Sequence, residues 1–238
     1  MLRTLVISIM VLLSSGRGES AEPFVVAHRG LLRHAPENTP AAFRSCLALR
    51  FGFEFDVQRS RDGHLVCVHD DTLDRTTNGR GPVRERTLAE LKFLDAGRWF
   101  AASFAGERIP AIPEILDLVR ADAGPSTLMA VDLKDADPAV GVEVIRLAED
   151  RGTLNRLLFI GATIRSRDLR QALRSQSQLV QTAAVVENSA ELQGVLEDAT
   201  ATWAYLRYVP AAEEVQRCHA VNKPVFVAGP HFAGEERA

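Results

Sequence analysis

The stretch FGFEFDVQRSRDGHLVCVHD, residues 51–70, decides how we interpret the fold of the whole chain. Its first half alternates bulky apolar residues with two carboxylates, Glu54 and Asp56, a pattern typical of a β-strand with two different faces. We expect the aromatic face to pack under helices and the acidic face to gather two charges in one place. Such a pair is unfavourable unless a cation neutralises it, and a divalent cation with oxygen ligands fits that need. An isolated pair of this kind is more often a solvated surface, so the interpretation depends on what lies near it.

The second half of the stretch predicts another strand over residues 65–69, after a turn at Asp62 and Gly63. Cys67 and His69 would share one face of that strand. His69 would then lie at the carboxyl end of a strand, which is where open sheets and barrels hold their chemistry.

Strand-like and helix-like segments alternate from residue 24 to residue 228 and predict an α/β fold with a parallel sheet. Further strands are expected at 24–28, 128–134, 157–162, 179–186, 203–209 and 224–228, and helices at 40–50, 88–94, 112–121, 138–151, 167–175, 190–197 and 211–220. About seven such β/α units approach a (β/α)8 TIM-type barrel. A doubly wound sheet is the alternative, but no glycine-rich phosphate loop follows the first strand. A polar insertion over about residues 70–110 is expected to form a wall of the active site.

The composition is that of an ordinary globular protein, with 238 residues, 46% hydrophobic and 25% charged residues, and a net charge of −3. One domain is expected over residues 22–238. The charge gives no reason to expect a nucleic-acid partner. The three cysteines allow one disulfide but do not imply it, and we interpret them as small buried residues.

The amino terminus has the order of a secretory signal peptide over residues 1–21, which predicts a secreted or periplasmic protein. Arg3 is followed by the apolar run Leu5–Leu13, which is too short to span a bilayer, and then by small residues. No stable membrane insertion is expected after cleavage. A buried amino-terminal strand is the alternative interpretation of the same run.

Seven polar residues follow or lie on the predicted strands and are candidates for chemistry. They are His28, Arg29, Glu54, Asp56, His69, Asp132 and Lys134. Histidines suit acid–base work near neutral pH, carboxylates suit Ca²⁺ or Mg²⁺, and the two cations suit an anion such as a phosphate. Together they indicate phosphoryl transfer to water with a metal as Lewis acid.

Four ordered motifs resemble the glycerophosphodiester phosphodiesterase family. They are HRG…PENT at residues 28–39, E-x-D at 54–56, DGHLVCVHDDTLDRTTNGRG at 62–81 and LDAGRWFAASFAGERIPAIPEIL at 94–116. The resemblance implies a TIM-type barrel with a small insertion after the second strand. It also implies metal-dependent hydrolysis of glycerophosphodiesters to an alcohol and sn-glycerol 3-phosphate, in phospholipid and glycerol metabolism.

The resemblance also implies roles by position. His28 and His69 match the acid–base pair, and Arg29 and Lys134 match residues that bind the phosphate. The implied metal ligands are Glu54, Asp56 and Asp132, the last at a position where the family most often has a glutamate. Glu37 and Asn38 match a motif that we interpret as shaping the loop and capping the next helix.

The carboxyl-terminal part departs from the family pattern. PVFVAGPHF, residues 224–232, lacks the usual Trp-x-x-Asn, and nothing matches the last β/α unit of the family. We therefore expect a barrel left open between its first and seventh strands, with two unpaired edges and marginal stability. Residues 229–238 are the segment expected to close the sheet if the barrel is in fact complete.

Two alternative functions stay open on the sequence alone. One is a phosphodiesterase of the same fold that acts on intact phospholipid, and the other is a non-catalytic barrel that binds phosphate esters. The preferred head group, the native metal and the oligomeric state are also open.

Overall fold

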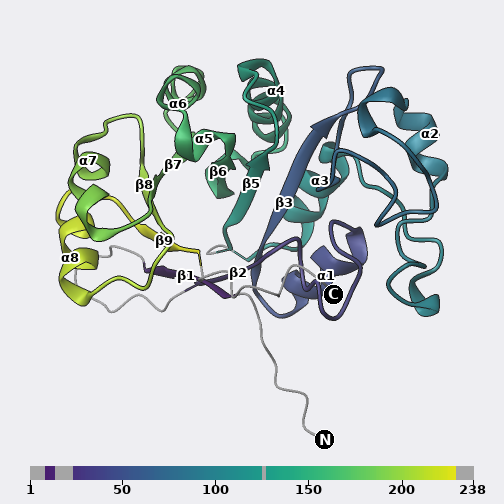
Figure 1. Cartoon of the computed structure of the whole chain (residues 1–238), viewed down its shortest axis with the longest axis horizontal. Coiled ribbons are helices and arrows are strands. Elements are labelled where there is room, and N and C mark those ends of the chain that lie inside the picture. Colours follow the sequence, from purple (N-terminus) through teal and green to yellow (C-terminus); the bar gives the residue numbers. More distant parts are fainter. Residues whose placement is uncertain (1–8, 14–23, 125–126, 229–238) are drawn as a thin grey trace, which may run out of the picture.

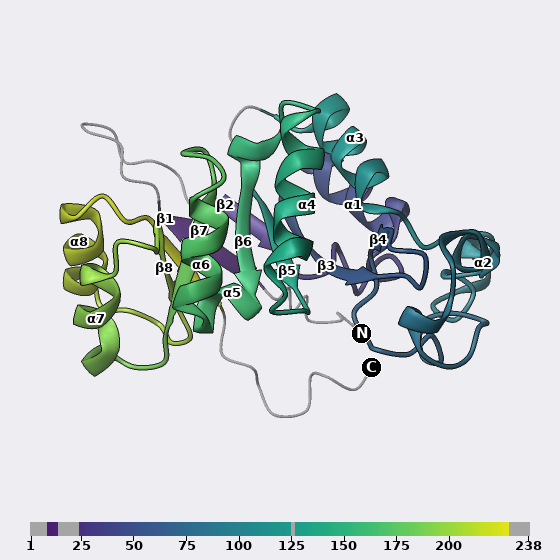
Figure 2. The same cartoon turned by 90° about the horizontal axis from the view of Figure 1, so that it is seen from above.

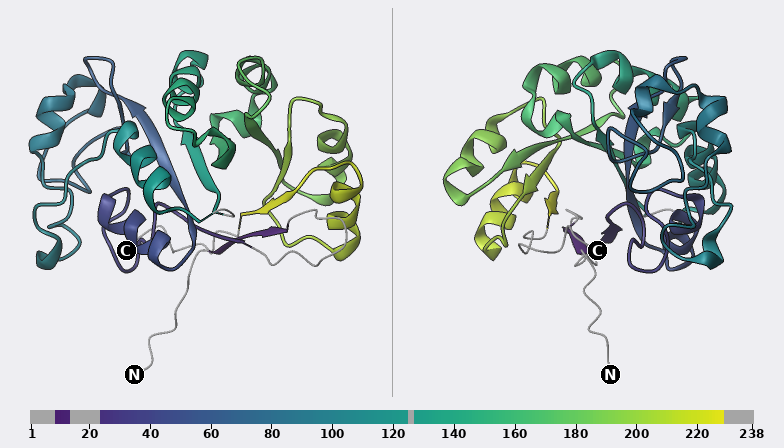
Figure 3. Two further views of the ribbon diagram at one scale, coloured as in Figure 1. Left: turned by 180° about the vertical axis from the view of Figure 1, so that it is seen from behind. Right: turned by 45° about the vertical axis from the view of Figure 1, so that its right-hand side comes forward.

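The computed structural model describes residues 9–13, 24–124 and 127–228, with only the backbone described for residues 9–13. Seven parallel strands form the sheet: β2 (Phe24–Ala27), β3 (Gly52–Arg59), β5 (Met129–Leu133), β6 (Leu157–Gly161), β7 (Gln181–Val186), β8 (Trp203–Leu206) and β9 (Val225–Val227). Each pairs with the next along the chain, and the sheet curls into an arc with helices on its convex side (Figure 3). The predicted α/β architecture of barrel type is confirmed.

The helices alternate with the strands as the sequence predicts (Figures 1 and 2). They are α1 (Pro40–Ala48), α2 (Leu88–Phe93), α3 (Ile112–Asp122), α4 (Pro138–Glu149), α5 (Ala162–Arg165), α6 (Arg167–Arg174), α7 (Leu192–Glu197) and α8 (Ala212–Ala220). Helix α1 begins where its sequence signals predict, because the Thr39 side chain accepts a hydrogen bond from the Ala42 amide and Pro40 occupies the first turn. None of the helices in the described ranges has the length and apolar character needed to cross a bilayer.

Strand β3 has the two faces that its alternating sequence predicts. Phe53 and Phe55 are fully buried, and Phe43 of α1 stacks on Phe53 with ring centroids 4.3 Å apart. Side chains on a strand alternate between its faces, so Glu54 and Asp56 point to the opposite side, away from the helix. Packing of the aromatic face therefore fixes the direction in which both carboxylates point.

The sheet does not have the two free edges that the sequence predicts. Ile9–Leu13 forms a strand, β1, that runs antiparallel to both β2 and β9. Val11, for example, pairs with Val25 on one side and Val227 on the other. Because β2 also pairs with β3, the eight strands close into a ring. The expectation of an open barrel is therefore wrong: part of the apolar run predicted as an export signal supplies the missing partner. Residues 229–238, the alternative closing segment, lie outside the described residues.

We expect Val11→Pro to destabilise the protein by breaking this closure. Proline has no amide hydrogen to donate and is rarely tolerated between two paired strands. Each backbone group left buried without a partner costs about 1–3 kcal/mol, so the free energy of unfolding in urea should fall by at least about 1 kcal/mol. A variant that lacks residues 1–8 keeps β1 and serves as the control. Equal stability of Val11→Pro and the unchanged chain would contradict a closing role for β1.

The predicted insertion lies between β4 (Leu65–Val66) and α3, and it contains α2. It extends to one side of the sheet (Figure 1). Its apolar side chains pack with Val66 of β4 and with Val68 in a cluster separate from the barrel core, completed by Leu73, Val83, Leu91, Ala96 and Ile109. The insertion is thus a small packed unit, and its loops are held in place from inside.

Candidate active site

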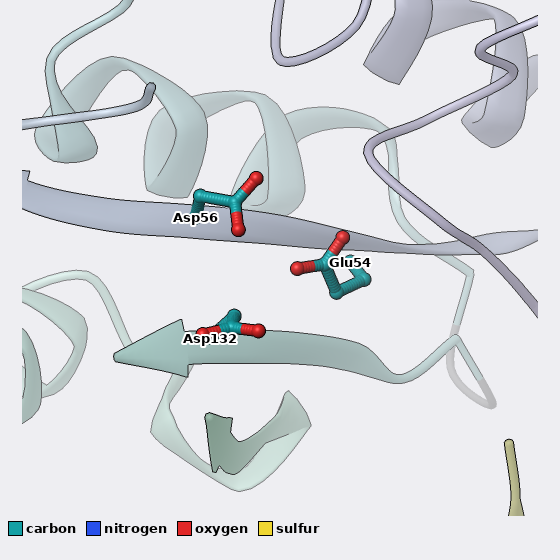
Figure 4. A group of neighbouring side chains, drawn as sticks. All are labelled: Glu54, Asp56 and Asp132. Atoms are coloured by element: carbon teal, nitrogen blue, oxygen red, sulfur yellow. The ribbon is translucent and has the colours of Figure 1, made fainter. Parts of the chain in front are cut away.

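Three carboxylates converge on the inner side of the sheet. Glu54 and Asp56 come from β3, and Asp132 comes from the neighbouring β5, where it is in register with Asp56. Their carboxylates point toward one another (Figure 4), and one oxygen of each lies within 4.8 Å of the others. Glu54 is 1% exposed and Asp56 is 0% exposed, so water cannot stabilise these charges.

The electrostatics of the three carboxylates differ. Burial, together with the charges of Asp56 and Asp132, raises the pKa of Glu54 well above its ordinary value. Burial likewise raises the pKa of Asp132. For Asp56 burial acts in the same direction, but Lys134 and the other nearby positive charges outweigh it and lower the pKa. The site therefore keeps Asp56 ionised and leaves Glu54 short of positive charge.

Lys134 is a cation that lies against two carboxylates of this cluster. Its Nζ atom is 2.6 Å from Asp56 Oδ1 and 3.4 Å from Asp132 Oδ1. The Lys134 side chain is 25% exposed, so it borders the cluster and also faces solvent. Lys134 therefore lies at the rim of the acidic cluster. It is one of the residues that the family resemblance implies to bind the phosphate.

Glu54 shows that the carboxylates fit a cation. Its Oε2 atom accepts a hydrogen bond from the Arg29 amide at 2.8 Å, whereas its buried Oε1 atom accepts none within the described part of the chain. A buried carboxylate oxygen without a partner is unfavourable. Hard oxygen ligands are those that Ca²⁺ and Mg²⁺ prefer, and the three side chains could hold such an ion between them.

Arg29 connects the loop after β2 to the acidic cluster. Its backbone adopts a left-handed conformation, with φ of 52°. The side chain donates to Glu37 Oε1 at 3.2 Å, and its Nε lies 3.8 Å from Asp56 Oδ2. A non-glycine residue in this conformation is unfavourable and often marks a functional site. The left-handed backbone of Arg29 allows its amide and its guanidinium to face the carboxylates together.

His28 is the other residue that directly follows β2. Burial, and next the charge of Arg29, lower its pKa from 6.5 to about 4, against the opposing charges of Asp56 and Glu37. The imidazole is therefore neutral at pH 7 and can accept a proton.

The lowered pKa of His28 predicts a dependence of stability on pH. Between pH 6.5 and about 4 the unfolded chain binds a proton at His28 that the folded chain does not bind, so this residue lowers stability as the pH falls. His28→Gln should therefore lose less stability between pH 7 and pH 5 than the unchanged chain does, as measured by urea unfolding. The exposed His34, changed to Gln, is the matched control. An unchanged pH dependence in His28→Gln would contradict the prediction.

The sequence predicts His69 at the carboxyl end of a strand, but in the structure it lies in a loop. The strand β4 contains only Leu65 and Val66 and runs antiparallel to the end of β3, so the predicted strand over residues 65–69 is wrong in length and role. The side chain of Gln58 replaces the strand ladder there. It donates to the carbonyls of Val68, His69 and Asp70 at 3.0, 3.2 and 2.7 Å. His69 is nevertheless close enough for its charge to act on both His28 and Asp56.

Asn38 orients Asp56, a role that the sequence does not predict. The Asn38 backbone is left-handed, with φ of 56°, and its Nδ2 donates to Asp56 Oδ2 at 2.6 Å. Its Oδ1 accepts from the Asp56 amide at 3.3 Å and from the Cys67 thiol at 3.0 Å. One oxygen of Asp56 is thus occupied, and the other faces Lys134.

All three cysteines are free and buried, as the sequence predicts.

His69 also belongs to a chain of ion pairs that the sequence does not predict. His69 Nδ1 lies 2.8 Å from Asp70 Oδ1, and the guanidinium of Arg75 contacts both Asp70 and Glu37. The sequence motifs contain all of these residues. No spacing rule, however, predicts that a side chain of the insertion meets one from the loop before α1.

The model of the glycerophosphoryl diester phosphodiesterase family matches residues 28–229. The chain belongs to this family. The match runs from the histidine after β2 to just beyond β9, and it includes all seven candidate residues and the insertion.

Curated members of the glycerophosphoryl diester phosphodiesterase family match shorter parts of the chain. The glycerophosphodiester phosphodiesterase of Caldanaerobacter subterraneus subsp. tengcongensis is 54% identical over 96 residues, which is 40% of each chain. That of Bacillus subtilis is 41% identical over 101 residues, 39% of this chain and 34% of the relative. The matched segments thus span less than half of the length of these relatives.

Two solved structures extend the similarity over most of the fold. A glycerophosphodiester phosphodiesterase from Agrobacterium tumefaciens is 32% identical with a TM-score of 0.67, and the match covers 82% of both chains. A phosphodiesterase from Oleispira antarctica, in complex with the product sn-glycerol-3-phosphate, is 25% identical with a TM-score of 0.71. That match covers 89% of this chain and 85% of the other. The architecture is therefore that of the family.

The aspartate at position 132 leads to a prediction about side-chain length. Asp132→Glu keeps the charge and can reach the other carboxylates, whereas Asp132→Ala removes a ligand. We expect Asp132→Glu to bind a divalent cation more tightly than Asp132→Ala, as measured by calorimetric titration. Equal affinity of the two variants would rule out Asp132 as a ligand.

Proposed function

We propose that the chain hydrolyses glycerophosphodiesters to an alcohol and sn-glycerol 3-phosphate, with a divalent cation held by Glu54, Asp56 and Asp132. One observation carries the proposal: in a member of this family, three converging carboxylates lie beside Arg29 and within electrostatic reach of two histidines. The complex of a similar phosphodiesterase with sn-glycerol-3-phosphate supports the same product here.

The two histidines suit opposite halves of the proton exchange. Cleavage of a phosphodiester requires that the attacking oxygen loses a proton and the leaving oxygen gains one. His28 is neutral at pH 7 and suits the base, which accepts the proton of the attacking water or substrate hydroxyl. His69 Nδ1 lies 2.8 Å from Asp70 Oδ1, which leaves Nε2 as the ring nitrogen that can face the leaving oxygen, so His69 suits the acid.

The positive groups suit the phosphate. Arg29 presents a fork of donors, and Lys134 presents a point charge at the rim of the carboxylates. The divalent cation, proposed as Ca²⁺ or Mg²⁺, would supply Lewis-acid polarisation of a phosphoryl oxygen. Arg29 and Lys134 would then orient the phosphate against the two histidines.

The proposal is tested by release of glycerol 3-phosphate from glycerophosphocholine and glycerophosphoethanolamine, with and without a chelator. Intact phosphatidylinositol vesicles are a parallel substrate, because a phospholipase of the same fold would cleave them instead. We expect metal-dependent release from the small diesters and none from the vesicles. Binding of a glycerophosphodiester without any turnover in added Ca²⁺ or Mg²⁺ would favour a non-catalytic barrel and overturn the proposal.

We further propose that the amino-terminal segment directs export to the periplasm or the outside of the cell. Arg3 and the apolar run Leu5–Leu13 support this, since they have the order of a signal peptide. Cleavage after residue 21 would also remove β1, so the closed ring belongs to the uncleaved chain, and the Val11→Pro comparison is made on that form. Fractionation of expressing cells, with sequencing of the mature amino terminus, tests the proposal.

A further inference from the structure

Arg75, on the insertion, makes two bidentate ion pairs at the edge of the candidate site. Its Nε and Nη2 atoms donate to Asp70 Oδ2 and Oδ1 at 2.7 and 2.9 Å. Its Nη1 and Nη2 atoms donate to Glu37 Oε2 and Oε1, both at 2.8 Å. Single surface ion pairs stabilise little, but forked pairs in a network have defined geometry and resist rearrangement.

Both carboxylates that bind the Arg75 guanidinium also contact residues of the candidate site. Asp70 Oδ1 is also the partner of His69 Nδ1 at 2.8 Å, and Glu37 Oε1 also accepts from Arg29. The Glu37 side chain is only 9% exposed, whereas that of Arg75 is 43% exposed. The buried glutamate therefore anchors the arginine, and the arginine holds the more accessible aspartate.

The insertion sets the position of Arg75 through its own packing. Leu73 is fully buried in the apolar cluster of the insertion. Its carbonyl accepts hydrogen bonds from the Thr77 amide and hydroxyl at 3.2 and 2.7 Å, which close a turn around Arg75. The packing of the insertion therefore sets where Arg75 lies relative to Asp70, the residue that contacts His69.

The chemical consequence follows from the charge of Asp70. The Arg75 hydrogen bonds are the largest cause that holds the pKa of Asp70 below its ordinary value. An ionised carboxylate only accepts hydrogen bonds, so the His69 Nδ1 that faces it must carry a hydrogen. Nε2 is then the ring nitrogen left for substrate.

We propose that Arg75 is a positioning residue that, through Asp70, fixes the ring orientation and the Nδ1–H tautomer of His69. The inference rests on the proposed function for its effect on catalysis, but the tautomer itself does not depend on turnover. Without Arg75, Asp70 can rotate away from the ring, and the two neutral tautomers become closer in population.

The test compares Arg75→Ala, Arg75→Lys and Asp70→Asn with Arg80→Ala. Arg80 lies on the same insertion, is exposed, and contacts Asp74, so it is a matched control. Nitrogen-15 NMR of the His69 imidazole, assigned with His69→Gln, reports the tautomer. We expect mostly Nδ1–H in the unchanged chain and in Arg80→Ala, and a mixture in Arg75→Ala and Asp70→Asn. Arg75→Lys should restore little, because an ammonium cannot make the two forked pairs.

The kinetic effect separates positioning from substrate binding. Removing an outer partner that orients a metal-ligating histidine typically costs about 10–100-fold, and we expect a fall of the same order in the kcat of Arg75→Ala, with a smaller change in KM. Unfolding in urea identifies any variant that has lost its fold, and Asp70→Asn tests the same link with Arg75 in place. An unchanged tautomer in both folded variants would overturn the inference. Absence of hydrolysis in the unchanged chain would overturn the proposed function but leave the tautomer comparison decisive.

Discussion

His28→Ala and His69→Ala should each lower kcat/KM by roughly 10²–10⁴-fold, the usual contribution of a positioned acid or base. The two losses have different causes. His28 is neutral at pH 7 because burial lowers its pKa to about 4, so its variant lacks the group that accepts a proton. His69 is supported by Asp70, so its variant lacks the group that protonates the leaving oxygen. The measurement is steady-state hydrolysis of glycerophosphocholine at saturating metal.

Two features make the histidine prediction specific. His64, on the turn before β4, has a side chain that is 59% exposed, and His64→Ala is the matched control, with activity expected near that of the unchanged chain. A substrate with a good leaving group, such as a nitrophenyl ester of glycerol phosphate, needs little protonation. It should therefore rescue His69→Ala but not His28→Ala. A loss below tenfold in either variant would remove that histidine from the mechanism.

Removal of divalent cations should abolish hydrolysis. Lewis-acid stabilisation of a phosphoryl transition state contributes several kcal/mol, which corresponds to a loss of about a thousandfold or more. Glu54→Gln keeps the size of the side chain and an acceptor for the Arg29 amide, but removes the buried negative charge. It should therefore weaken binding of Ca²⁺ or Mg²⁺ in calorimetric titration.

The exposed Glu149, changed to Gln, is the control for loss of one negative charge. After chelation, readdition of the cation should restore full activity in the unchanged chain. In Glu54→Gln the same readdition should restore only part of the activity. Full activity in a metal-stripped preparation would contradict the proposed requirement for a divalent cation.

The sequence predicts most of the barrel because each β/α unit is encoded locally. Alternation over residues 52–57 and helix signals at Thr39 and Pro40 depend only on near neighbours along the chain. The same alternation places Glu54 and Asp56 on one face, and the parallel register with β5 then brings in Asp132. The acidic cluster could therefore be predicted from strand geometry together with the resemblance.

Other features are not local and could not be predicted in this way. The strand β1 comes from an apolar run that is equally typical of a signal peptide, and only its partners on both sides distinguish a strand. Residues 65–69 alternate like a strand, but only Leu65 and Val66 pair with a neighbouring strand. The contact between Arg75 and Glu37 joins residues 38 positions apart through side chains alone.

The separate apolar cluster of the insertion has a consequence for how activity would be lost on heating. Units with their own small core can open while the rest of a protein stays folded. Opening of the insertion would withdraw Arg75 from Asp70 and leave the carboxylates of β3 and β5 in place. Catalytic failure and global melting are therefore separable events in this molecule. Hydrogen exchange should reveal them as two protection levels, the lower in residues 73–109 and the higher in the barrel strands.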